Sequence, residues 1–78
     1  MNEDADLVRM ANNIAANFAV YPEAEAIAAI VRHVTDFWPR PMRDRLVAEA
    51  HESGNLAPLA AAAARVLAAR DGHATGAA

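Results

Sequence analysis

Residues 37–43 read Phe-Trp-Pro-Arg-Pro-Met-Arg, and they separate two segments in which apolar residues recur at helical spacing. Pro39 and Pro41 lack a backbone N–H, and each disfavours helical geometry in the residue before it, so no helix can continue through this stretch. The sequence therefore predicts two helical halves joined at a corner. Phe37 and Trp38, two of the four aromatic residues, lie at that corner beside arginines.

Four helices are predicted from the apolar periodicity and from the prolines between the periodic segments. Their expected ranges are residues 4–20, 22–37, 41–53 and 56–70. The residues expected to define their ends are Pro22, Pro41 and Pro58 in first turns, Gly54 as a left-handed cap and Asn55 as an N-terminal cap.

Short connections between these helices make consecutive helices antiparallel neighbours. We therefore expect an all-α fold, a small compact bundle of about four short antiparallel helices with a proline-rich corner between the second and the third. A three-helix core with the fourth helix packed on a partner is the alternative. Residues 1–78 are expected to form one helical domain, ordered over about residues 4–70, with a disordered tail at 71–78.

Apolar side chains recur at helical spacing in the first and fourth helices. They form one stripe of the first helix, Leu7, Met10, Ala11, Ile14 and Phe18, and share one face of the fourth, Leu56, Leu59, Ala60, Ala63, Val66 and Leu67. The first helix also contains Asn12, Asn13 and Asn17, although asparagine is a mediocre helix former. This asparagine face is either solvated or a polar interface that hydrogen-bonds the backbone of a partner.

The core available to a chain of 78 residues is thin, because 22 of them are alanine and an alanine buries little more than a methyl group. The chain has no cysteine that could form a disulfide. Association with another protein is the remaining route to stability.

Charge and hydropathy exclude several classes of partner. The net charge is −3, and a protein that binds nucleic acid is usually basic, so we expect no nucleic-acid partner. No apolar run is long enough to span a membrane, and the acidic N-terminal residues do not resemble a signal peptide. We expect a cytoplasmic protein without a membrane partner.

Catalytic and metal-binding patterns are missing from the sequence. The few hydroxyl residues have no histidine and acid at suitable spacing, and the three histidines are 18 and 22 residues apart. His33, at the edge of the second helix's apolar stripe, is expected to be a packed structural residue. The chain is expected not to be an enzyme and to bind neither a cofactor nor a metal.

Several short motifs, in order, resemble the delta subunit of NAD-dependent formate dehydrogenases that contain molybdenum or tungsten. The similar segments are Leu7-Val8-Arg9-Met10-Ala11-Asn12-Asn13-Ile14, Phe18 with Pro22, His33, residues 37–43 with Leu46, and Leu56-Ala57-Pro58-Leu59. The resemblance as a whole covers about residues 5–70. Many family members have an acidic residue and an arginine around a single proline, where this chain has Pro39 and Arg40 before Pro41.

The resemblance implies a small accessory subunit without a cofactor of its own. Its partners would be the large catalytic subunit and the associated electron-transfer subunits of a complex that oxidises formate to carbon dioxide and reduces NAD. That complex would carry bis-molybdopterin guanine dinucleotide, iron–sulfur clusters and FMN. The predicted partner-interface residues are Met10, Asn13, Asn17, Phe37, Trp38, Arg40, Met42 and Arg43.

Two other functions remain open at this point. The chain could be a maturation factor that binds the catalytic subunit while the molybdenum cofactor is inserted. Alternatively, it could be a self-associating module whose alanine-rich fourth helix forms a homodimer.

At the corner, Phe37 and Trp38 either close the core or face a partner, or Trp38 enters the core while Phe37, Arg40 and Arg43 face outward.

Overall fold

Four α-helices make up the computed structural model, which describes residues 3–52 and 54–71 and contains no strand within them. The helices are α1 (Glu3–Phe18), α2 (Glu23–Phe37), α3 (Arg40–Glu52) and α4 (Pro58–Asp71). The predicted all-α class is confirmed, and each predicted boundary lies within two residues of the observed one. The predicted disordered tail lies outside the described residues, except for Asp71, which ends α4.

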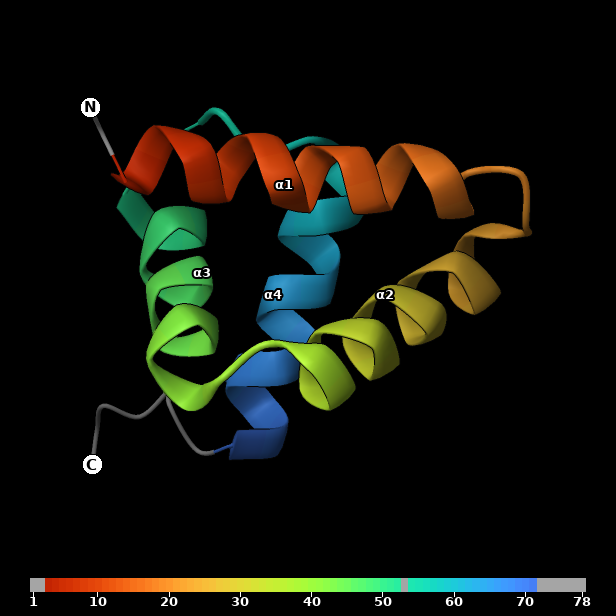
Figure 1. Ribbon diagram of the computed structural model, residues 1–78. Coiled ribbons are helices and arrows are strands. Elements are labelled where there is room, and N and C mark those ends of the chain that lie inside the picture. The colour runs from red at the N-terminus through yellow and green to blue at the C-terminus, as the bar shows by residue number, and fades with distance from the viewer. Residues whose placement is uncertain (1–2, 53, 72–78) are drawn as a thin grey trace.

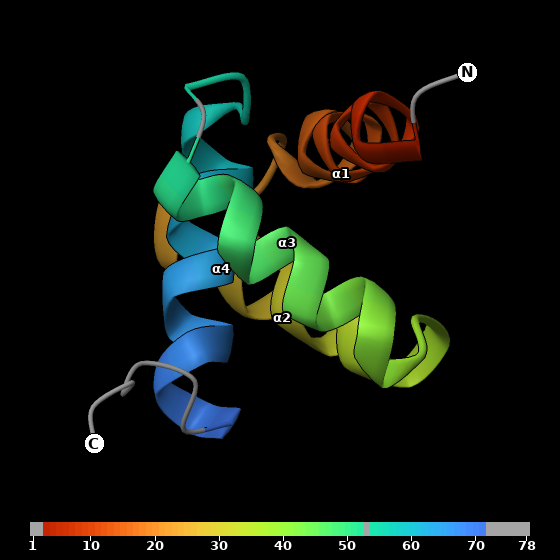
Figure 2. The ribbon, with the colours of Figure 1, turned by 90° about the vertical axis from the view of Figure 1, so that its left-hand side faces the viewer.

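The chain reverses direction between α1 and α2 and again between α3 and α4 (Figure 1). Figure 2, which views the molecule nearly along the axis of α1, shows that α1 lies across α4 rather than alongside it. In the view of Figure 1, the first half of α1 lies above α3, and its second half lies above α2.

The corner between α2 and α3 has the geometry that its two prolines require. Trp38 is extended, with φ −101° and ψ 132°, and its N–H donates the last bond of α2 to the carbonyl of Val34 at 2.9 Å. The carbonyl of Pro39 accepts the N–H of Arg43 at 3.1 Å and so begins α3. Pro41 lies in the first turn of α3, as predicted, where a missing N–H costs no hydrogen bond.

Three predicted helix ends differ from the structure. Pro22 precedes α2 instead of lying within its first turn, and its carbonyl accepts the N–H of Ala26 at 2.8 Å. Gly54 does not have the left-handed φ expected of a C-terminal cap. Asn55 does not cap α4, because α4 begins only at Pro58 and the intervening residues form a loop.

The loop before α4 is held by a side chain from α1. The Asn12 Oδ1 accepts the N–H of Ala57 at 2.7 Å, and the Asn12 Nδ2 donates to the carbonyl of Asn55 at 3.0 Å. The amide of Asn12 thus satisfies a donor and an acceptor of one backbone segment. This pair of bonds, the Asn12 clamp, fastens the start of α4 to the middle of α1.

Small side chains dominate the core of the described residues. Seven of its fifteen buried apolar residues are alanine, including Ala60, Ala63, Ala64 and Ala68 of α4. Val66 was predicted to share a face with Ala63 and Leu67, but it is 41% exposed, whereas Ala64 and Ala68 are buried. The alanine face of α4 is therefore used inside the chain.

We expect Asn12→Ala to lower the free energy of unfolding by about 1–2 kcal/mol, because the N–H of Ala57 would lose its acceptor. Asn13→Ala is the matched control, since Asn13 is an exposed residue of the same helix. Urea unfolding followed by the fluorescence of Trp38, the only tryptophan, measures both. Equal free energies of unfolding for the two variants would contradict a stabilising role of the Asn12 clamp.

Candidate functional site

The two neighbouring aromatic residues of the corner have opposite environments. Trp38 follows Val34 on the core face of α2 and is only 9% exposed. Phe37 lies at the edge of that face and is 72% exposed. The structure therefore has the combined arrangement, in which Trp38 completes the core and Phe37 faces outward.

Phe37 ends a continuous row of aromatic rings, the aromatic row, which consists of Tyr21, Phe18, His33 and Phe37. Ring centroids are 6.2 Å apart between Tyr21 and Phe18, 6.2 Å between Phe18 and His33, and 4.9 Å between His33 and Phe37. His33 is packed between two rings, as expected of a structural histidine. The row connects α1 to α2, and its two ends are exposed, with Tyr21 at 50%.

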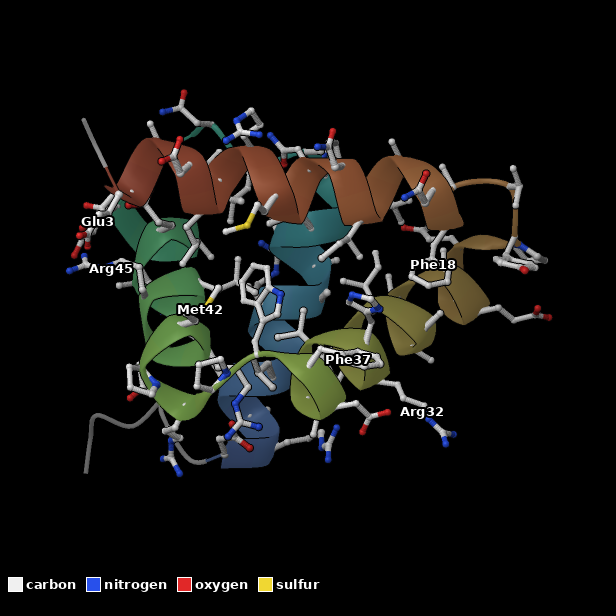
Figure 3. All side chains as sticks on the ribbon, in the orientation of Figure 1. Glu3, Phe18, Arg32, Phe37, Met42 and Arg45 are labelled. Atoms are coloured by element: carbon white, nitrogen blue, oxygen red, sulfur yellow. The ribbon has the colours of Figure 1, made fainter. Side chains whose placement is uncertain are left out.

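A groove of about 410 Å³ lies between α1 and α3. Its apolar lining, which we call the α1–α3 groove floor, consists of Leu7, Met10, Pro41 and Met42. Met10 is 37% exposed and Met42 is half-buried against the core. Figure 3 shows Met42 in the area framed by α1, α2 and α3, which also contains Phe18 and Phe37.

The rim of the α1–α3 groove is acidic. It comprises Glu3, Asp4 and Asp6 from the first turn of α1, and Arg45 from α3. The Nε of Arg45 lies 3.2 Å from an oxygen of Asp4, and Glu3 and Arg45 lie close together in Figure 3. Asp6 pairs with Arg9 at 3.2 Å across a solvated surface, where such a pair contributes about 0.2–1 kcal/mol.

The predicted asparagine face is divided by the structure. Asn12 points toward the loop before α4, whereas Asn13 and Asn17 are exposed. Asn13 and Asn17 follow Met10 at spacings of three and seven residues, so the three lie on one side of α1. They continue along the helix beyond Met10 and are not among the residues that line the α1–α3 groove.

The two predicted arginines differ in their surroundings. Arg40 is exposed, and its Nε lies 3.4 Å from the Oδ1 of Asp44. Arg43 is half-buried, and its Nε has no hydrogen-bond partner in the described part of the chain. A buried donor without a partner costs about 1–3 kcal/mol.

The predicted interface residues thus occupy several places. Met10 and Met42 meet in the α1–α3 groove, Phe37 ends the aromatic row, and Trp38 is in the core. Their assignment to a partner interface stays a prediction.

Sequence analysis missed Glu3, Asp6, Phe18 and Tyr21 as members of these surfaces. Glu3, Asp6 and Met10 follow one another at spacings of three and four residues, which could have indicated that they share a face. The contact of Phe18 with His33 joins two helices, so helical spacing alone could not have shown it.

Neither a metal site nor a membrane span occurs in the part of the chain that the structure describes. No three histidine, cysteine, aspartate or glutamate side chains of residues 3–52 and 54–71 are grouped to hold a metal ion. Among the same residues, every helix is too short or too polar to cross a bilayer.

Comparison with known proteins gives one match. The family model described as the NADH-dependent formate dehydrogenase delta subunit FdsD matches residues 6–64, which is more than half of the chain. The match includes α1 from Asp6 onward, α2, the proline corner, α3 and the first half of α4. No curated protein and no solved structure matches the chain.

Truncating each of the two neighbouring aromatic residues of the corner should lower the free energy of unfolding by a different amount. Trp38→Ala should lower the free energy of unfolding by about 3–5 kcal/mol, because it empties a large volume in the core. Phe37→Ala should lower it by less than about 1 kcal/mol, since a mostly exposed side chain is removed. Thermal unfolding followed by far-ultraviolet circular dichroism measures both, and similar losses would contradict the assigned positions.

Proposed function

The chain belongs to the family of NADH-dependent formate dehydrogenase delta subunits, and we propose that it is a small, non-catalytic accessory subunit that binds and stabilises the catalytic subunit. The family match supports membership of a formate dehydrogenase complex, in agreement with the resemblance in sequence. The observation that supports a binding role is Phe37, a large apolar side chain held 72% exposed at the end of the aromatic row.

The balance between buried and exposed side chains supports this role. Nearly half of the buried apolar residues in the described chain are alanine, whereas Phe37, Tyr21, Val20 and Met10 are exposed. Full burial of one large apolar side chain contributes about 1.5–3 kcal/mol, so covering this surface would add substantially to the stability of a small chain. Aromatic residues and methionine are also enriched in the centres of protein interfaces.

The chemistry of the complex is assigned in this proposal to other subunits. The catalytic and electron-transfer subunits would carry bis-molybdopterin guanine dinucleotide, iron–sulfur clusters and FMN, and they would pass electrons from formate to NAD. This chain would act by binding, through packing and charge-assisted hydrogen bonds to its partner. We place it with these subunits in the cytoplasm, in contact with neither nucleic acid nor membrane.

The two alternatives make different demands on the chain. Self-association through the alanine face of α4 is disfavoured, because Ala60, Ala63, Ala64 and Ala68 already pack in the core of the same chain. A maturation factor would use the same exposed residues but would leave the complex after cofactor insertion. The presence of the chain in the mature enzyme therefore separates the two remaining functions.

The chain, tagged and expressed in its native host, should co-purify with active formate dehydrogenase at a fixed ratio. A strain that lacks the chain should yield enzyme that loses formate oxidation faster on heating, because a partner that binds only the folded state stabilises it. Metal analysis of each preparation measures cofactor content independently. Active, metal-replete enzyme without the chain would contradict a permanent subunit, and selective binding to cofactor-free enzyme would favour the maturation factor.

The role of the aromatic row is tested by a charge at its exposed end. Phe37→Asp should reduce recovery of the catalytic subunit by about tenfold or more, since a carboxylate would replace a buried ring in the interface. Val66→Asp is the matched control, because Val66 is also an exposed apolar residue but lies on α4. Equal recovery with both variants would exclude the aromatic row from the interface.

A further inference from the structure

We propose that the α1–α3 groove receives an apolar side chain from a basic segment of the catalytic subunit. This inference rests on the proposed function and adds the chemistry of the segment that the delta subunit binds. It uses a surface distinct from the aromatic row, formed by the first halves of α1 and α3.

The α1–α3 groove floor suits an apolar side chain. Its four residues, Leu7, Met10, Pro41 and Met42, offer no polar side-chain group other than two thioethers. Met10 and Met42 come from opposite walls, and methionine adapts its shape to an inserted group. A volume of about 410 Å³ can take one or two side chains. The lack of convergent polar groups distinguishes this floor from a site for a polar small molecule.

The charge of the groove rim indicates the charge of the partner segment that would bind there. Three carboxylates and one guanidinium line the groove, and the guanidinium, from Arg45, is already paired with Asp4. Asp6 is paired with Arg9, which lies outside the lining, and Glu3 has no ion pair in the described part of the chain. With Arg9 included, three carboxylates and two guanidiniums leave one net negative charge at the rim. The net negative rim therefore attracts lysine or arginine, and the chain as a whole also carries a net charge of −3.

The shape fits a known mode of recognition, in which an amphipathic segment places its apolar side chains between two helices. Asn13 and Asn17 lie beyond Met10 on the same side of α1, outside the groove, and their exposed amides can bond to polar groups on the same segment. Figure 3 places Met42 on the face that also presents Phe37 and Phe18. One partner surface can therefore cover the groove and the aromatic row together.

A photo-crosslinking residue in place of Met10 identifies the occupant directly. The same residue in place of Val66 is the matched control, because both native side chains are exposed to a similar extent, 37% and 41%. Position 10 should crosslink to the catalytic subunit, at a site with lysine or arginine within a few residues, and position 66 should not. Crosslinking to a second copy of this chain, or to a segment without basic residues, would overturn the inference.

Charge reversal tests the rim. The double variant Glu3→Lys, Asp6→Lys should recover at least about tenfold less catalytic subunit at low salt, and its recovery should fall less as salt is raised. Glu23→Lys, Glu25→Lys is the matched control, because these acids occupy the first turn of α2 and are equally exposed. Circular dichroism verifies that both variants fold. Equal recovery of the catalytic subunit with the two double variants would overturn the inference that the bound segment is basic.

The outcome for the native sequence separates the two proposals. If the native chain does not co-purify with formate dehydrogenase, the proposed function fails. If it does co-purify while position 10 yields no crosslink to the catalytic subunit, only the groove inference fails.

Discussion

Burial of Trp38 at the corner between α2 and α3 is the interaction on which the rest of this structure depends. An aromatic side chain buries about 150–250 Å², and here it fills a core in which nearly half of the apolar residues are alanine. Pro39 ends α2 immediately after Trp38, so the anchored indole also determines where α3 begins. The position of α3 in turn brings Pro41 and Met42 opposite Leu7 and Met10, which creates the groove.

The groove also depends on how α1 is held across the other helices. The Asn12 clamp joins the middle of α1 to the loop before α4, and the pair between Asp4 and Arg45 joins the start of α1 to α3. The exposed ion pair contributes little by itself, whereas loss of the clamp leaves backbone groups of the loop without their partner. The polar contacts of α1 therefore act mainly to position it, and apolar packing supplies most of the stability.

Much of this fold follows from the sequence, because prolines and helical spacing are local signals. The four helices and the proline corner were predicted, and the burial of Trp38 with an outward Phe37 was one of the three arrangements that the sequence left open. The face of α4 was not predictable in the same way, because alanine is apolar on every side of that helix and Val66 could not be distinguished from Ala64. The role of Asn12 was also hidden, since its partners lie more than forty residues away along the chain.

The candidate surfaces could not be predicted for a similar reason, because each combines side chains from different helices, and helical spacing does not show how those helices pack. Met10 and Met42 were expected at an interface, but only the crossing of α1 over α3 makes them two walls of one groove. Phe37 ends the aromatic row because α1 and α2 pack so that the ring of His33 lies between those of Phe18 and Phe37. A core in which nearly half of the apolar residues are alanine lets helices approach closely, while several larger apolar side chains, among them Met10 and Phe37, are exposed. The composition that gives the chain a thin core thus also leaves apolar side chains exposed, and these form the surface proposed to bind a larger subunit.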